Sequence, residues 1–463
     1  MNNVLELLKA ELPAALSTDP AALAACRLDK SGHESSTPPL AIVNATTIAE
    51  VQATMRIATA TGTPVVVRGA GTGLAGGAIA GDGEIVLSTL GMTRILEVSE
   101  DDELAVVEPG IINADLNTAL ASTGLWFAPD PASRAISTVG GNIATNAGGL
   151  LCAKYGVTRE AVLGLKIVLA DGRLMTLGHR TVKGVTGLDL VGLLIGSEGT
   201  LGVIVEATVK LRRLPQGTPS TIGAYFSTVE DAARAASVIS ASGLRPAIME
   251  LLDPRAMTSI ADYLGVTVRA ESFLLVQTDG GGAEGEATAA LAIIRSLGGD
   301  ATLTTDPEEA ARLMALRRSF HPAMESRGTV LIEDVCVPRS TLPAMFHAID
   351  EIAARHGVTI ATVAHAGDGN LHPNFVYEGA EVPEAVWAAA HEMFQTALRL
   401  GGTLTGEHGV GLLKKRWLRD ELGDDQVDLQ RDIKRVFDPS GILNPGKLFS
   451  EAPDTVRASA LAE

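Results

Sequence analysis

Two histidines, His365 and His372, stand seven residues apart within the stretch 364–375, and glycines separate them. Glycines at this density disfavour a helix and predict a chain that folds back on itself, which can bring both imidazoles to one point. Further along, Glu407 and His408 form a second polar pair with glycine on either side. Two imidazoles and a carboxylate are common ligands of a divalent metal, and a further histidine beside them is a typical base. The four side chains therefore predict a metal site with a proton acceptor next to it.

Spacing alone leaves a second interpretation open. A histidine in a loop is often a hydrogen-bonded structural residue without a catalytic role. What favours chemistry here is concentration, because the chain has nine histidines and three of them fall in these two glycine-bracketed turns. Only the set as a whole, and neither of the first two histidines alone, indicates a metal.

The composition narrows the class of protein. The chain of 463 residues is long enough for two domains, and 46% of it is hydrophobic, as in ordinary globular proteins. A formal net charge of −18 argues against nucleic acid as a partner and against direct binding to an anionic membrane. No uninterrupted apolar run is long enough for a transmembrane helix, and residues 1–16 lack the pattern of a signal peptide. Three scattered cysteines predict free thiols in a reducing cytoplasm.

The elements before these side chains include a glycine-rich loop at 68–78, which follows a predicted strand. Its backbone N–H groups suit a pyrophosphate. Gly71, Gly73 and Gly76 also match the G-x-G-x-x-G pattern of Rossmann folds, but that pattern must open a helix, and here a strand is predicted at 84–88. We therefore expect a phosphate-binding loop outside a Rossmann fold. A glycine-rich hairpin without a ligand is the alternative.

Two further glycine-rich segments follow at 137–149 and 195–204. The first is rich in small hydroxyl and amide side chains, which can hydrogen-bond a polar ring system or a phosphate while glycines let the backbone approach closely. Pro215 and Gly217 then mark a domain boundary, beyond which strands alternate with long helices. This alternation predicts an antiparallel sheet covered by helices.

Six motifs occur in an order that resembles one type of flavoprotein, at 68–78, 129–149, 196–204, 365–374, 406–411 and 437–447. That type is the vanillyl-alcohol-oxidase/p-cresol-methylhydroxylase flavoproteins. Within it the chain looks like the FAD-linked D-2-hydroxyacid dehydrogenases, a group of glycolate oxidase catalytic subunits, D-lactate dehydrogenases and D-2-hydroxyglutarate dehydrogenases. The resemblance extends over about residues 38–450.

The resemblance implies an α+β protein with a non-Rossmann FAD-binding domain of two subdomains. A substrate or cap domain, with an antiparallel sheet covered by helices, is expected to meet it at the isoalloxazine. The chain then divides into an N-terminal helical segment at 1–37, the FAD-binding domain at 38–216, a substrate and metal-binding domain at 217–425, and a C-terminal helix and turn at 426–455 that returns to the FAD-binding domain.

For the reaction, the resemblance implies a divalent metal held by His365, His372 and Glu407, with His408 as the catalytic base. Zn²⁺ is the expected metal, and Mn²⁺ or Fe²⁺ also suit these ligands. A metal on an α-hydroxyacid lowers the pKa of the hydroxyl, a neutral imidazole takes its proton, and the flavin takes the hydride.

Substrate contacts are implied for Arg317, Asn374 and His408, the arginine holding the carboxylate. His321 stands where some relatives have a threonine, and we expect it among the substrate contacts too. Relatives that take 2-hydroxyglutarate carry a lysine for the second carboxylate at the position of Ile332 here. An apolar side chain cannot pair with that group, so a short monocarboxylate, D-lactate or glycolate, is the expected substrate.

Charged residues near Ile332 also bear on whether the substrate has one carboxylate or two. Glu333 and Asp334 are expected to repel a second carboxylate. D-2-Hydroxyglutarate stays open as an alternative substrate because three arginines could compensate: Arg318, Arg327 and Arg339.

The resemblance also implies contacts to FAD. The loop 68–78 has no histidine for covalent attachment, so the FAD is expected to be non-covalent. The expected cofactor residues are Arg68, Gly69, Gly71, Thr72, Gly73, Leu74, Pro129, Asp130, Thr138, Gly140, Gly141, Ala144, Thr145, Asn146, Gly148, Gly149, Tyr155, Glu198, Gly199, Gly202, Ile204 and Asn444.

Two other functions remain open at this point. One is a flavin-dependent alcohol oxidase or dehydrogenase that uses no metal, and the other is a non-catalytic nucleotide-binding subunit, which should lack the His and Glu motifs. The electron acceptor is open among a quinone, a cytochrome, an electron-transferring flavoprotein and an iron–sulfur subunit. A homodimer is one of the assemblies left open. We expect a cytoplasmic protein, with attachment to the inner face of the membrane through a partner as an alternative.

Overall fold

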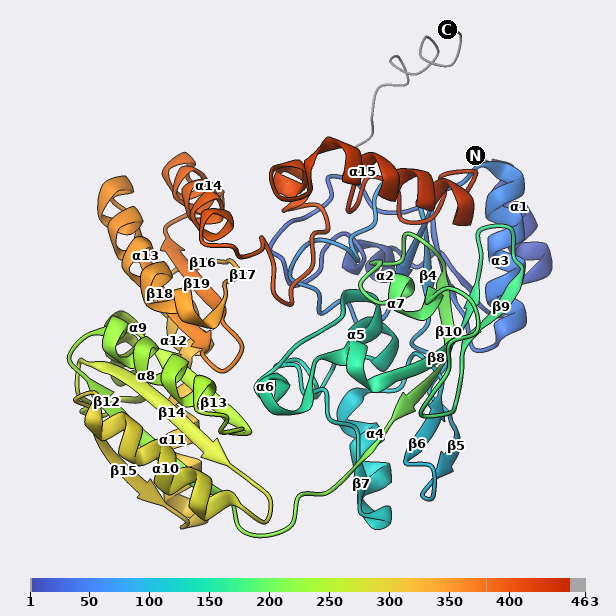
Figure 1. Cartoon of the computed structure of the whole chain (residues 1–463). Coiled ribbons are helices and arrows are strands. Elements are labelled where there is room, and N and C mark those ends of the chain that lie inside the picture. The colour runs from blue at the N-terminus through green and yellow to red at the C-terminus, as the bar shows by residue number, and fades with distance from the viewer. Residues whose placement is uncertain (1, 380, 450–463) are drawn as a thin grey trace, which may run out of the picture.

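The computed structural model describes residues 2–379 and 381–449 and shows two domains (Figure 1). The N-terminal domain holds two main sheets, and the C-terminal domain holds one large sheet. The chain crosses between them after β11 (Arg212–Arg213). The last helix, α15 (Leu418–Phe437), lies again on the N-terminal domain. Residues 450–455 of the predicted C-terminal segment are outside the described part of the chain.

The first sheet has the strand order β1-β2-β4-β3, with β2, β4 and β3 parallel and β1 antiparallel to β2. Its strands are mainly apolar because both faces are covered, by α1 and α3 on one side and α2 on the other. The N-terminal segment is therefore part of this sheet. The elements are α1 (Asn2–Glu11), β1 (Leu16–Ser17), α2 (Pro20–Ala25), β2 (Ala41–Asn44), α3 (Ile48–Thr61), β3 (Val65–Arg68) and β4 (Ile85–Ser88).

The second sheet is antiparallel, in the order β5-β6-β10-β8-β9. Helices α4, α5 and α7 cover one of its faces, where their apolar residues form a core with β6, β8 and β10. A short pair, β7 with β11, and the one-turn helix α6 lie beside it. The elements are β5 (Ile95–Ser99), β6 (Leu104–Val107), α4 (Asn113–Leu120), β7 (Leu125–Trp126), α5 (Val139–Thr145), α6 (Cys152–Tyr155), β8 (Val162–Val168), β9 (Leu174–Gly178), α7 (Leu190–Leu194) and β10 (Val203–Lys210).

The third sheet is antiparallel, in the order β15-β12-β14-β13-β18-β19-β16, and β17 also pairs with β19. Helices α8, α10, α13 and α14 pack on one face, and α9, α11 and α12 pack on the other. Its strands are β12 (Ser220–Phe226), β13 (Ile248–Leu252), β14 (Ser272–Thr278), β15 (Asp300–Thr304), β16 (Thr329–Ile332), β17 (Val335–Cys336), β18 (Thr359–His365) and β19 (Asn370–Tyr377). Its helices are α8 (Val229–Ala241), α9 (Pro254–Leu264), α10 (Ala283–Ser296), α11 (Pro307–Arg318), α12 (Phe320–Glu325), α13 (Leu342–His356) and α14 (Glu384–Arg399).

The α+β architecture predicted from the sequence is confirmed, with two sheet-containing subdomains followed by an antiparallel sheet covered by helices. The segment 137–149 contains the helix α5, an element that its run of small residues did not predict. Thr138 caps this helix by accepting a hydrogen bond from the N–H of Gly141 at 3.1 Å, and Asn146 ends it in a left-handed conformation.

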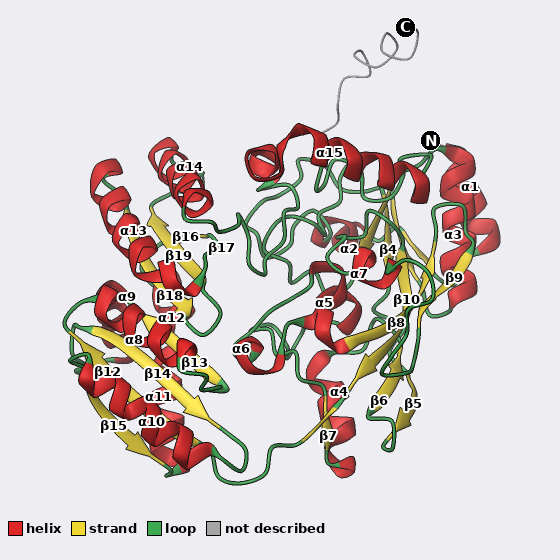
Figure 2. Cartoon of the chain, in the orientation of Figure 1, coloured by secondary structure: helices red, strands yellow, loops and turns green. Residues whose placement is uncertain are grey.

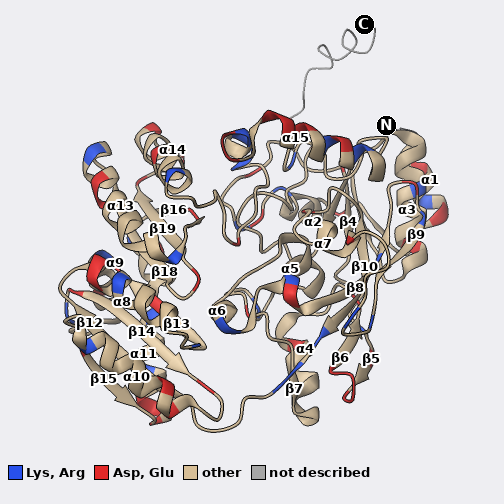
Figure 3. Ribbon diagram, viewed as in Figure 1, with Lys and Arg blue, Asp and Glu red and all other residues tan. Residues whose placement is uncertain are grey.

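Mainly loops meet where the two domains face each other, as the green segments of Figure 2 show. Acidic and basic residues are interspersed along the outer helices in the view of Figure 3, which shows no uniformly basic face. Among the described residues, no helix combines the length and the apolar character that crossing a bilayer requires.

Candidate active site

The two histidines lie on adjacent strands of one hairpin, β18 and β19. Val363 pairs with His372 in its register, and His365 follows Val363 by two residues. Because side chains alternate along a strand, His365 and His372 point to the same face of the sheet, and their ring centroids are 5.0 Å apart. The chain turns back at Gly369, whose φ of +92° favours glycine. The expected fold-back is thus a hairpin, with the histidines on its strands.

The loop 405–411, which carries Glu407 and His408, is held by the buried carboxylate of Asp334. Its Oδ2 atom accepts hydrogen bonds from the hydroxyl of Thr405 at 2.6 Å and from the backbone N–H groups of Glu407 and His408 at 3.0 and 2.9 Å. Three donors on one oxygen leave this loop little freedom. Asp334 therefore fixes where the Glu407 and His408 side chains begin.

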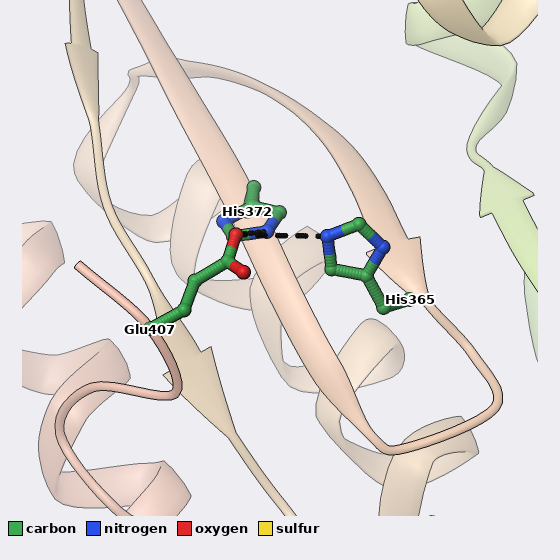
Figure 4. A group of neighbouring side chains, drawn as sticks. All are labelled: His365, His372 and Glu407. Carbon is green, nitrogen blue, oxygen red and sulfur yellow. Dashed lines mark ion pairs between the residues drawn. The ribbon is translucent and has the colours of Figure 1, made fainter. Parts of the chain in front are cut away.

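Glu407 reaches both histidines (Figure 4). Its Oε1 atom lies 3.0 Å from Nε2 of His372 and 3.6 Å from Nε2 of His365. One ligand atom from each of the three side chains lies within 4.8 Å of the other two. Two imidazoles and a carboxylate converging in this way can hold a divalent ion and leave further coordination positions for a substrate.

The surroundings of these three residues carry an excess of negative charge. Four carboxylates lie here at 0 to 17% side-chain exposure, against two cationic side chains at 4 and 15%. Buried charge without compensation is costly, so a bound divalent cation would suit this cluster. The carboxylates are Glu250, Glu333, Asp334 and Glu407, and the cations are Arg317 and Lys414.

His408 stacks on His372, with ring centroids 5.0 Å apart and planes inclined by 15°. Burial lowers the pKa of His408 to about 4, and the nearby carboxylate of Asp334 offsets only part of this effect. The imidazole is therefore neutral near pH 7 and can accept a proton. Its Nδ1 atom is buried and has no hydrogen-bond partner in the described part of the chain, so Nε2 is the nitrogen open to a substrate.

The predicted substrate residues share one cavity with the three predicted metal ligands and His408. Asn374 is buried on β19 and donates from Nδ2 to the carbonyl of His372 at 2.9 Å. Arg317 reaches the cavity from the end of α11, at 15% side-chain exposure. His321, on α12, is half exposed and lies 3.2 Å from the carboxylate of Glu325.

This cavity lies between the two domains and has a volume of about 1090 Å³. Residues from all three glycine-rich segments form its wall on the N-terminal domain, which leaves backbone and small hydroxyl groups facing the space. Its size and lining fit a cofactor as long as FAD. The predicted cofactor residues that line it are Gly69, Gly71, Thr72, Gly73, Leu74, Asp130, Thr138, Gly140, Gly141, Ala144, Thr145, Gly148, Gly149, Glu198, Gly199, Gly202 and Ile204.

Five predicted cofactor residues are not among those that line the cavity: Arg68, Pro129, Asn146, Tyr155 and Asn444. Arg68 and Asn444 support the first glycine-rich loop from behind by donating to its carbonyls at 2.6 and 3.0 Å. Asn146 ends α5 at φ 52°. The hydroxyl of Tyr155 donates to Asp279 at 2.6 Å and so ties the N-terminal domain to the C-terminal one.

Sequence reasoning missed Glu250, which lies fully buried on β13. Its Oε1 accepts a hydrogen bond from Nδ1 of His365 at 2.7 Å, and its Oε2 accepts one from Nε of Arg317 at 2.5 Å. Burial alone would raise the pKa of Glu250, but the two cationic partners hold it below its usual value. A lone acidic residue within the apolar run 247–252 was the available signal.

The N-terminal segment also reaches the site, which nothing in its sequence indicated. Lys30, Ser31 and Gly32 line the cavity, and the N–H of Lys30 donates to the carbonyl of Gly73 at 3.0 Å. The segment that includes these residues therefore adds to the wall formed by the first glycine-rich loop.

Glu333 and Asp334, which the sequence predicted to repel a second carboxylate, are not among the residues that line the cavity. Both side chains are buried, and Nζ of Lys414 lies 3.6 and 3.8 Å from their carboxylates. Ile332 does line the cavity, and so does Arg318. Of the residues that the sequence connected with a second carboxylate, Ile332 and Arg318 are the ones that line the cavity.

Two family patterns match the chain, the FAD binding domain at residues 39–178 and the FAD linked oxidases, C-terminal domain, at residues 218–448. The glycolate oxidase subunit GlcD of Bacillus subtilis is 42% identical over 398 residues, which is 84% of each chain. The D-lactate dehydrogenase of Archaeoglobus fulgidus is 37% identical over 89% of this chain and 94% of its own. The D-2-hydroxyglutarate dehydrogenase of Xanthomonas citri is 34% identical over 91% and 92%.

Among solved structures, p-cresol methylhydroxylase with substrate bound has a TM-score of 0.78 at 17% identity and covers 97% of each chain. The fold and the interdomain site thus define a flavoprotein of this structural type. The chain belongs to the FAD-linked oxidases, and it is an oxidoreductase that binds FAD.

Proposed function

We propose that this enzyme oxidises a short D-2-hydroxyacid, D-lactate or glycolate, to the 2-oxoacid in an FAD-dependent and metal-assisted reaction. The observation that carries the proposal is the convergence of His365, His372 and Glu407 in the cavity that also holds Arg317 and His408. A 2-hydroxyacid presents a hydroxyl and a carboxylate on adjacent carbons. A cation site and an arginine in the same cavity are the two partners that such a substrate needs.

Each residue of the site has its own role in the proposed reaction. When bound, FAD accepts the hydride and a divalent ion held by His365, His372 and Glu407 acts as a Lewis acid toward the hydroxyl. Nε2 of His408 accepts the hydroxyl proton, which its neutral state allows. Arg317 binds the substrate carboxylate through its terminal nitrogens, since its Nε is already paired with a buried carboxylate.

The preference for a short substrate rests on Ile332, which supplies an apolar group to the cavity wall. The Bacillus and Archaeoglobus relatives, which are named as a glycolate oxidase subunit and a D-lactate dehydrogenase, support the same preference. A second candidate, D-2-hydroxyglutarate, is favoured by Arg318 in the same cavity and by the name of the Xanthomonas relative.

The flavin is held without a covalent bond, in this proposal, because the loop 68–78 offers no histidine. Electrons leave it for an external acceptor, a quinone, a cytochrome, an electron-transferring flavoprotein or an iron–sulfur subunit. The Bacillus relative is named as a subunit, which supports an acceptor carried by a partner.

The test is an anaerobic titration of the purified flavoprotein with D-lactate, glycolate and D-2-hydroxyglutarate, followed by the flavin absorbance and by metal analysis. Bleaching by the short acids, with about one metal per chain, is the expected outcome. Bleaching mainly by the dicarboxylate would identify D-2-hydroxyglutarate as the substrate and leave the proposed mechanism unchanged. Full reduction of a protein free of metal would refute the assigned metal role and favour a metal-independent flavin enzyme.

A further inference from the structure

A single buried carboxylate connects the two halves of the proposed substrate site. Glu250 has no exposed surface and uses one oxygen for His365 and the other for Arg317, at 2.7 and 2.5 Å. Both partners line the cavity, while Glu250 itself is not among the lining residues. Glu250 therefore acts on a ligand only through these two neighbours.

The strand register explains the first contact. Glu250 on β13 is the direct partner of His365 on β18, so the two side chains lie on the same face of the sheet. When His365 holds a metal, its Nδ1 donates a proton to Glu250 and the lone pair of the other ring nitrogen, Nε2, is left for the cation. The carboxylate thus sets the tautomer and the orientation that a metal ligand needs.

The second contact fixes the arginine. Glu250 occupies Nε of Arg317, which lies near the end of α11, and within the described residues its terminal nitrogens have no hydrogen-bond partner. A guanidinium held at Nε can turn its two terminal N–H groups to a carboxylate in a fixed direction. Arg317 is thus held at Nε and keeps its two terminal nitrogens for a ligand, which is what a carboxylate-binding arginine requires.

We propose that Glu250 is a positioning residue that sets the spacing between the metal subsite and the carboxylate subsite. The inference rests on the proposed function, since it takes His365 as a metal ligand and Arg317 as the carboxylate anchor. Glu250 ties both to one strand, so the subsite for the hydroxyl and the subsite for the carboxylate keep a fixed separation. Metal binding and substrate binding should therefore weaken together when this one side chain changes.

The test compares Glu250→Gln with the wild type, using Glu206→Gln as the matched control. Glu206 pairs with Lys166 at 3.0 Å on the second sheet and touches neither subsite. The glutamine amide turns its N–H₂ group toward one of the two donors and offers the other only an uncharged carbonyl, so it weakens both contacts. Zn²⁺ affinity is measured by titrating metal-stripped flavoprotein, and D-lactate affinity by anaerobic flavin bleaching at saturating Zn²⁺.

The expected result for Glu250→Gln is a loss of about 10- to 100-fold in Zn²⁺ affinity, the range seen when the partner of a metal-bound histidine is removed. A loss of about tenfold or more in D-lactate affinity, with unchanged FAD content, should accompany it. Wild-type values for both ligands, or a change in only one of them, would overturn the inference.

Glu250→Asp covers the case in which the glutamine variant does not fold. It keeps the charge but is one methylene shorter, so it cannot span both partners, and both affinities should again fall. Unchanged affinities in this variant would overturn the inference as well. The wild type reports separately on the proposed function, because a wild type that binds no Zn²⁺ and is bleached by no hydroxyacid would refute that function whatever the variants do.

Discussion

Glu198 holds the backbone of Val410, two residues after His408 along the chain. Its Oε1 accepts the N–H of Val410 at 2.7 Å, and its Oε2 accepts the N–H of Gly411 at 2.8 Å. Glu198 lies in the third glycine-rich segment of the FAD-binding domain and is buried. The loop that carries His408 is therefore fixed to the N-terminal domain through Glu198 as well as to the C-terminal domain through Asp334.

The first prediction is that Glu198→Gln slows flavin reduction while FAD stays bound. The amide would leave one of the two loop N–H groups facing another donor, which costs about 1–3 kcal/mol. If this cost falls on the position of His408, the rate of flavin reduction should drop roughly 5- to 160-fold. Stopped-flow reduction by D-lactate measures the rate, and the flavin to protein ratio measures retention. Glu206→Gln, which removes a carboxylate elsewhere on the same domain, should behave as the wild type. An unchanged rate in Glu198→Gln would show that this contact does not position His408.

The second prediction concerns His408 itself. His408→Gln removes the proton acceptor and should lower the rate of flavin reduction about 10²- to 10⁴-fold, the usual share of general base catalysis. The side chain is not one of the three predicted metal ligands, so metal content and FAD content should match the wild type. Retention of both groups together with the slow rate separates a lost base from a disordered site. A variant that reduces its flavin at the wild-type rate would remove His408 from the mechanism.

The third prediction is that chelation abolishes substrate-dependent flavin reduction without releasing FAD. The three clustered ligands have atoms within 4.8 Å of one another, whereas the three glycine-rich segments that would hold FAD belong to the other domain. Dialysis against a strong chelator should leave the flavin spectrum intact and stop bleaching by D-lactate. Added Zn²⁺ or Mn²⁺ should restore it, and His372→Ala should resist restoration. Full activity in protein shown to be metal-free would favour the metal-independent alternative.

Local patterns explain why much of the fold was predictable. Helix α8, one of the long helices expected after Gly217, can be located from its own residues, since Thr228 caps it and its apolar residues recur on the face that meets the sheet. Strand β14 can be located in the same way, because it is a short, mainly apolar run between turn residues. Both signals lie within a few residues of the element that they define.

Contacts between distant segments explain what could not be predicted. Glu250 and His365 are 115 residues apart in the sequence and meet only because β13 and β18 are neighbours in the sheet. No pattern local to either strand specifies that pairing. Tyr155 is a further example, because its hydroxyl meets Asp279 of the other domain, 124 residues away in the sequence.

The fourth prediction concerns the cradle for FAD. Gly140 lines the cavity, and a Cβ there would lie 2.5 Å from Cβ of Pro109 and 2.9 Å from its carbonyl oxygen. Gly140→Ala must therefore displace the start of α5, at a cost of about 1–3 kcal/mol, and the purified protein should carry less FAD. Gly281→Ala is the control, since its Cβ would meet open space. Equal flavin to protein ratios in the two variants would contradict this reading of the second glycine-rich segment.

The fifth prediction is that Ile332→Lys shifts the substrate preference toward D-2-hydroxyglutarate. Ile332 lines the cavity, and an ammonium at this position can pair with a second carboxylate that the isoleucine cannot bind. The ratio of kcat/KM for the dicarboxylate to that for D-lactate should rise about 10- to 100-fold, the equivalent of one charge-assisted hydrogen bond of 1.5–3 kcal/mol. Arg318→Ala is the companion measurement. If the wild type already prefers the dicarboxylate and Arg318→Ala removes that preference, then Arg318 rather than residue 332 determines substrate length.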